Sequence, residues 1–147
     1  MREHGSHVLK VFGDEEWPPF TYTIGLYENF RHPELIIVGM SGHLAHPLLN
    51  DVRDLIRGGR QFSAGDFSDE VLERFPVTFR AVSDENRLAH FGWATWFYGG
   101  EAYPALQLVL PDLQGRWPWD PTASDNARRI QPLLDTTPLP GWARNTS

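Results

Sequence analysis

The residues of this chain that could do chemistry fall in three short blocks. The first is the run of residues 20–26, rich in β-branched and aromatic side chains and interrupted by a glycine near its end. The second follows closely, where His32 and Glu34 flank a proline. The third, residues 111–120, lies far down the chain and combines proline, glycine and tryptophan. Because strands fix the loops that follow them, these blocks could present ionisable groups from rigid positions.

The second block is the candidate catalytic block. With an ordinary pKa of ~6.5, the imidazole of His32 could act as a general acid or base near neutral pH. The carboxylate of Glu34 would then orient the imidazole or bind a cation. A structural alternative is that His-Pro-Glu closes the loop, with the histidine hydrogen-bonded to the backbone. One histidine and one acid do not decide between the two.

A small-ligand site has aromatic walls and a few convergent polar groups. The first and third blocks, together with an apolar run near residue 107, supply side chains of this kind. The candidate ligand-binding residues are Tyr22, Thr23, Gln107, Asp112, Trp117 and Trp119. The alternative is a packed aromatic core in which Asp112 caps a turn that Gly115 closes, as Pro-Asp-x-x-Gly sequences favour.

Metal and cofactor chemistry has little support in the sequence. His43 and His46 are three residues apart and could share a helix face, with His32 or Glu34 completing a ligand set. However, the His-Glu-x-x-His spacing of zinc peptidases is absent, and Pro47 interrupts the backbone nearby. We therefore predict no metal site, and the sequence indicates no particular cofactor.

Composition excludes several classes of protein. The chain has 147 residues, enough for one domain with a real core, and 41% of them are hydrophobic. It has 19 acidic residues against 13 basic ones, a net charge of −6 that disfavours nucleic-acid binding. There is no cysteine for disulfides or thiolate chemistry. No run approaches the ~20 apolar residues of a membrane span, and we expect a cytoplasmic protein.

The hydrophobic pattern predicts an α+β fold. We expect strands at residues 7–12, 20–26, 35–40, 77–82 and 105–110. A helix is expected over 41–57, regular from His46 because of Pro47, and a second over 84–98. Residues 69–75 and 124–134 are weaker helical segments. The prediction is a single domain over residues 1–134, with about five mostly antiparallel strands and two main helices packed on them. A loosely ordered tail, 135–147, would follow.

The order of the blocks resembles the bacterial family catalogued as domain of unknown function 4262. The resemblance covers about residues 4 to 120. It rests on Tyr22-Thr23-Ile24-Gly25-Leu26, His32-Pro33-Glu34-Leu35, Leu49-Asn50, Gly58 and Pro111-Asp112…Gly115…Pro118-Trp119. It implies a single-domain, cytoplasmic, bacterial protein, and it implies no catalytic residue.

Two functions remain open at this point. The first is a small-molecule-binding protein or small enzyme, with a pocket built from the Tyr22 strand, the His32 loop and the loop from Trp117 to Trp119. That pocket can form if strands 20–26 and 105–110 are neighbours in the sheet. The second is a non-enzymatic module, such as an immunity or accessory protein, that uses exposed aromatic residues to bind a protein partner. Enclosed tryptophans beside His32 would favour the first, and outward-facing tryptophans the second.

Overall fold

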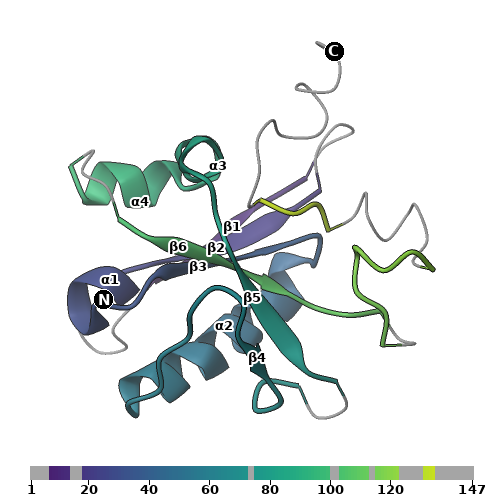
Figure 1. Cartoon of the computed structure of the whole chain (residues 1–147). Helices are drawn as coiled ribbons and strands as arrows, with labels where there is room; N and C mark the ends of the chain where they lie inside the picture. The colour runs from purple at the N-terminus through teal and green to yellow at the C-terminus, as the bar shows by residue number, and fades with distance from the viewer. Residues whose placement is uncertain are drawn as a thin grey trace.

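The computed structural model describes residues 7–13, 18–72, 75–99, 103–112, 115–122 and 131–134. Within them one sheet carries helices on both faces (Figure 1). The strands are β1 (His7–Val11), β2 (Phe20–Ile24), β3 (Glu34–Val38), β4 (Phe67–Ser68), β5 (Val77–Ala81) and β6 (Ala105–Val109). The helices are α1 (Leu26–Phe30), α2 (Gly42–Arg57), α3 (Asp84–His90) and α4 (Gly92–Phe97).

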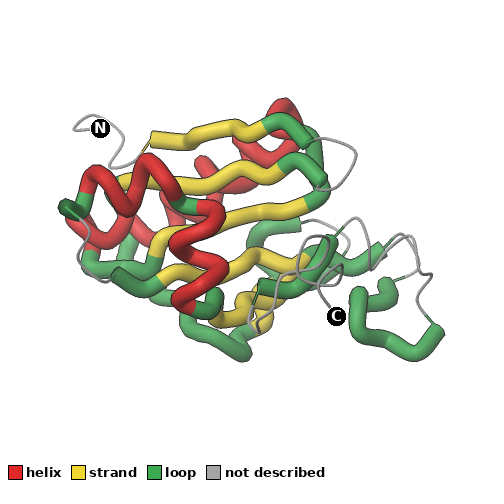
Figure 2. Tube along the Cα trace, turned by 90° about the horizontal axis from the view of Figure 1, so that it is seen from above, coloured by secondary structure: helices red, strands yellow, loops and turns green. Residues whose placement is uncertain are grey.

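The sheet is mostly antiparallel and has the strand order β1-β2-β3-β6-β5-β4 (Figure 2). Its one parallel pair is β3–β6, with Glu34 opposite Ala105. This confirms the predicted α+β class, with six strands in place of five because the short β4 had not been expected. The expected neighbours β2 and β6 are separated by β3, which determines how far apart the predicted site residues lie.

Two hydrophobic cores form because the strands present alternate residues to opposite faces. On one face, Tyr22 and Ile36 pack under α3 and α4 with Phe91 and Ala94. On the other, Leu35 and other odd-numbered positions of β3 pack under α2 (Figure 1). β3 is buried along its whole length, as its continuous apolar run predicts.

The first long helix begins earlier than predicted. α2 starts at Gly42, so Pro47 lies inside the helix instead of in its first turn. The helix tolerates the proline at the cost of one hydrogen bond to the carbonyl four residues back. The buried side of α2 also differs from the apolar stripe that the sequence predicts. Ala45 and Leu49 are buried against the sheet, whereas Leu44 is 59% exposed. The spacing of Leu44, Leu48, Val52, Leu55 and Ile56 in the sequence predicts one apolar stripe, and its inclusion of Leu44 is wrong.

The second predicted helix is two short helices. The chain breaks at Phe91, between α3 and α4, and this lets Phe91 and Ala94 enter the core. In a single helix over 84–98, the spacing of Leu88, Phe91, Thr95 and Trp96 predicts one shared side; in the structure Leu88 and Trp96 are exposed. Residues 69–72 are not helical, and of the segment 124–134 only 131–134 is described, as irregular backbone. The predicted tail lies outside the described residues.

We predict that Leu49→Ala destabilises the protein by ~2–5 kcal/mol, the usual cost of emptying a fully buried leucine site. Leu44→Ala on the exposed side of the same helix should change the free energy of unfolding by less than ~0.5 kcal/mol. Urea unfolding of the two variants measures both values. Equal losses would show that α2 packs through a different face.

Candidate functional site

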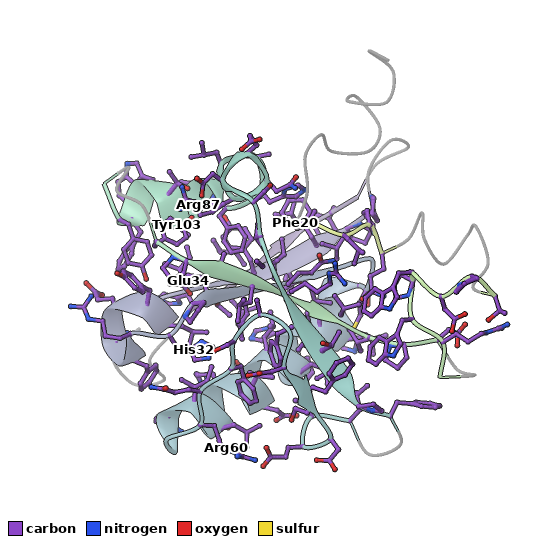
Figure 3. The ribbon with its side chains drawn as sticks, in the orientation of Figure 1. Phe20, His32, Glu34, Arg60, Arg87 and Tyr103 are labelled. Atoms are coloured by element: carbon purple, nitrogen blue, oxygen red, sulfur yellow. The ribbon has the colours of Figure 1, made fainter. Side chains whose placement is uncertain are left out.

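The carboxylate of Glu34 accepts five hydrogen bonds. Its side chain is fully buried, at 0% exposure, at the start of β3 (Figure 3). The Thr23 hydroxyl donates to Oε1 at 2.7 Å, and the Tyr98 hydroxyl donates to Oε2. The remaining donors are the backbone N–H groups of Gly25, Leu26 and Tyr27, at 2.9, 3.2 and 3.3 Å.

Gly25 makes this arrangement sterically possible. Its φ is 115°, in the left-handed region that glycine adopts readily. The turn directs three successive N–H groups at the first turn of α1 toward Glu34, so the carboxylate caps the helix. Because Gly25 ends a β-rich run before a tight loop, its sequence context predicts either a place where a side chain would clash or a positive φ, and the structure shows the positive φ.

Each hydrogen-bond partner of the Glu34 carboxylate is a donor, and these bonds from Tyr98, Thr23 and the backbone lower its pKa. Burial outweighs them, so the pKa of Glu34 is raised. Burial, and then the charge of Glu34, raise the pKa of Tyr98, so the phenol keeps its proton and donates. The carboxylate joins β2, α1, β3 and α4, and both of its oxygens are occupied.

His32 also has both ring nitrogens engaged. Nε2 accepts the Phe62 N–H at 2.9 Å, and Nδ1 lies 2.9 Å from the Pro33 carbonyl oxygen. The imidazole is 3% exposed, and burial lowers its pKa. The hydrogen bonds of Glu34 go to α1, Thr23 and Tyr98, not to the imidazole. The geometry therefore supports the structural alternative for His32 and Glu34.

Three other candidate residues, Tyr22, Thr23 and Gln107, also form hydrogen bonds within the protein. The Tyr22 hydroxyl accepts the Trp93 N–H at 3.1 Å, and Thr23 accepts the Leu35 N–H besides donating to Glu34. The amide of Gln107 donates to the Pro132 carbonyl and accepts from Leu134 N–H, which holds residues 131–134 against the sheet.

Asp112 closes the turn of the third block. Its Oδ1 accepts the Arg116 N–H at 2.9 Å, and its carbonyl accepts the Gly115 N–H. This matches the turn alternative that the Pro-Asp-x-x-Gly sequence raised.

Strand direction separates the three sequence blocks. His32 precedes the start of β3, and the loop of Trp117 and Trp119 follows the end of β6, the strand parallel to β3. At ~3.3 Å per residue, the five residues of β6 span ~16 Å. The His32 loop and the Trp119 loop consequently lie at opposite ends of the sheet (Figures 1 and 2). The structure brings Thr23, His32 and Glu34 to one end, and Asp112, Trp117 and Trp119 to the other. Tyr22 and Gln107 lie between these ends, each opposite Ile36 in the middle of β3.

A groove of about 390 Å³ lies beside Trp119, and we call it the Trp119 groove. It is lined by Ala64, Gly65, Phe67, Thr78, Phe79, Arg80, Ala81 and Trp119. The rings of Trp117 and Trp119 stack in parallel at 5.3 Å, and the Arg80 guanidinium lies 4.8 Å from the Trp119 ring centroid. Phe67 contacts Trp117 edge-on at 5.5 Å.

Sequence analysis missed Phe67 and Arg80 for different reasons. Phe67 lies in the two-residue strand β4, too short for a periodic pattern to show. Arg80 alternates with the apolar positions of β5, so it had to lie on the opposite side of the strand from Phe79. That alternation could have shown that β5 presents a polar side chain, but not that Trp119 would meet it.

A second groove, of about 340 Å³, lies between β1 and α4. It is lined by His7, Leu9, Ile24, Trp93, Trp96 and Phe97. Trp93 and Trp96 are 63% and 74% exposed, and their rings contact each other edge-on. We call this surface the Trp96 groove.

Metal ligands and membrane spans were searched for in the described residues. Within those ranges no three His, Asp or Glu side chains gather in a way that could hold a metal ion. None of the helices seen there is long and apolar enough to cross a bilayer.

Comparison with known proteins gives one match. The family described as Domain of unknown function (DUF4262) matches residues 1–124. No curated protein and no solved structure matches the chain.

We predict that Glu34→Gln destabilises the protein by ~3 kcal/mol or more, because the amide NH₂ would face N–H and O–H donors in a buried site. Glu28→Gln, on the exposed side of α1, is the matched control and should change stability by less than ~0.5 kcal/mol. Guanidinium unfolding reports both. A Glu34→Gln variant as stable as the Glu28→Gln control would show that the carboxylate does not hold the start of α1.

Proposed function

The chain belongs to the DUF4262 family, whose description assigns no activity, and we propose from its geometry that it binds a small molecule in the Trp119 groove. The observation that carries the proposal is that Trp119, which stacks on Trp117 and contacts Arg80, lines a concave surface. Small-molecule sites are concave, measure ~300–1,000 Å³, and are mostly apolar with a few polar groups. The groove meets these criteria at about 390 Å³.

The lining favours a planar aromatic ligand. Trp119 and Phe67 offer ring surfaces, and Trp119 is 39% exposed even though it stacks on Trp117. Stacking on two aromatic faces stabilises a flat ring more than a flexible aliphatic chain. The cationic Arg80 at the same wall favours a ring that carries a carboxylate.

Binding is favoured over catalysis in this groove. Among its described lining residues none carries a carboxylate or an imidazole, the groups that most often transfer protons in enzymes. His32 and Glu34, which sequence analysis took as catalytic candidates, lie at the other end of the sheet, with their polar atoms bound to the backbone and to Tyr98 and Thr23.

The test uses 2-naphthoate as the probe, followed by NMR of the tryptophan indole N–H groups. We expect 2-naphthoate to shift the Trp119 and Trp117 signals, and Trp119→Ala to weaken binding at least about tenfold through loss of the aromatic wall. Trp96→Ala, which removes an exposed tryptophan elsewhere, is the control and should bind as the unaltered protein does. Equal binding by Trp119→Ala would overturn the proposal.

A second candidate function is supported by the Trp96 groove. β1 is the outer strand of the described sheet and pairs there with β2 alone. An extended peptide could add to such an edge through its backbone and place apolar side chains between Trp93 and Trp96. Outward-facing tryptophans are the feature expected of a protein-interaction module.

Phage-displayed peptides selected on the protein would test this second function. The enriched peptides should have alternating apolar residues, and they should lose binding to Trp93→Ala and Trp96→Ala while keeping it to Trp119→Ala. Peptides that bind all three variants equally would contradict an interaction at the β1 edge.

A further inference from the structure

We propose that His32 is a pH-sensitive latch on the Trp119 groove: the neutral imidazole holds the loop of residues 60–66 in place, and protonation releases it. The claim about ligand affinity rests on the function proposed above for that groove. The claim about the loop stands on the contacts of His32 alone.

The hydrogen bonds of His32 fit only the neutral ring. Because the Phe62 N–H donates to Nε2 at 2.9 Å, Nε2 must carry a lone pair. The proton therefore sits on Nδ1, which donates to the Pro33 carbonyl oxygen at 2.9 Å. The imidazole is almost completely buried beside the start of β3 (Figure 3). A second proton on Nε2 would point directly at the Phe62 N–H.

Phe62 connects this hydrogen bond to the groove. Its ring stacks on Phe79 with a centroid distance of 4.5 Å and an angle of 19°. Phe79 lines the groove, and its carbonyl accepts the Gly65 N–H at 2.7 Å. Ala64 and Gly65 form one wall of the groove, two and three residues beyond Phe62. One end of the loop is thus held by His32 and the other by β5.

Protonation must disrupt the His32 end of the loop. It would place a positive charge in an apolar site and set two donors against each other. Burial lowers the pKa of His32 below its ordinary ~6.5. Once the loop is released, the imidazole of His32 is exposed and binds a proton more readily than the buried imidazole of the latched state does. The latch is closed above about pH 6.5, and its released population grows as the pH falls below that value.

The charged side chains on the elements around His32 form their contacts with residues other than His32. Arg31 lies over the Tyr27 ring, and Glu34 is bound by α1, Thr23 and Tyr98. Three other charged groups pair with residues near them in the chain: Arg60 with Glu70 after β4, Arg57 with Asp54 in α2, and Asp66 with the Ser63 N–H. The causes that move the pKa of His32 are burial and the Pro33 carbonyl, with no charged side chain among them. Burial raises the pKa of Glu34, but its hydrogen bonds go to α1, Thr23 and Tyr98, so the Phe62 N–H reports on His32.

The first experiment is amide hydrogen exchange of the unaltered protein by NMR between pH 7.5 and 5.0. We expect the protection factor of the Phe62 amide to fall by about tenfold or more over this range, as one linked proton allows. Amides of β6 should lose less, because the sheet does not depend on the latch. A Phe62 protection factor that stays constant, or that falls in parallel with β6, would overturn the proposal.

The matched variants are His32→Gln and His90→Gln. A glutamine at position 32 offers a carbonyl acceptor to Phe62 that does not titrate, so the pH dependence should disappear. His90 is the control, because it is also a buried histidine with a pKa lowered by burial, but it is the last residue of α3 and packs against Phe20. His90→Gln should keep the fall in Phe62 protection. If His32→Gln does not fold, the ring signals of His32 in the unaltered protein must titrate together with the Phe62 exchange, and independent titration would refute the latch.

Affinity for 2-naphthoate at pH 7.5 and 5.5 separates the two proposals. Weaker binding at pH 5.5 in the unaltered protein, with no such change in His32→Gln, supports control of the groove. If 2-naphthoate fails to bind at pH 7.5, the Trp119 groove proposal fails, and Phe62 exchange still decides whether the latch exists. Unchanged affinity with a released Phe62 would show that the loop does not control the groove.

Discussion

A carboxylate taken out of water must be surrounded by donors, or the fold that buries it is destabilised. Glu34 satisfies this requirement with five donors drawn from β2, the first turn of α1, and Tyr98 after α4. Since these elements come from separate stretches of the chain, the carboxylate can be satisfied only when they are assembled. Glu34 thereby fixes the end of the sheet at which β3 and β6 begin.

His32 acts next to this group through a different kind of contact. The imidazole of His32 is a neutral ring that bonds two backbone groups. Glu34 instead presents a carboxylate to five donors. Protonation of the buried imidazole removes its acceptor for the Phe62 N–H, whereas the Glu34 carboxylate meets donors alone. The same end of the sheet therefore combines an attachment through many donors at Glu34 with an attachment through one acceptor at His32.

The two grooves described above have room for a ligand or partner, and one of them, the Trp96 groove, includes Ile24 next to Gly25 at this end of the sheet. The Trp119 groove lies beside β5 and the turn that Asp112 closes, and the Trp96 groove lies between β1 and α4. Both contain a tryptophan and lie against a strand at or next to the edge of the described sheet. β1 is an edge strand, and β5 pairs with the edge strand β4. The rigid sheet carries the two surfaces, and short loops and a short helix supply their aromatic residues.

The amino-acid sequence determined the secondary structure where burial makes a regular pattern. β3 is continuous in apolar residues because both of its faces are covered, and β2 alternates because threonines face one core and aromatics the other. Gly25 was predictable as a positive-φ position, since a glycine that ends a β-rich run relieves a clash that other residues would meet. The turn role of Asp112 followed from local turn chemistry in the same way.

Only the tertiary structure decided which of these residues meet. Whether β6 lies beside β2 or beside β3, and in which direction, depends on long-range pairing that no local pattern contains, and this pairing put His32 and Trp119 at opposite ends. It also decided the role of Glu34: an acid before a strand can be a base or a helix cap, and the donors that choose between these lie up to 64 residues away. Hydrogen bonds between distant segments leave no periodic trace in a sequence, because each residue records only its own type and not its partner.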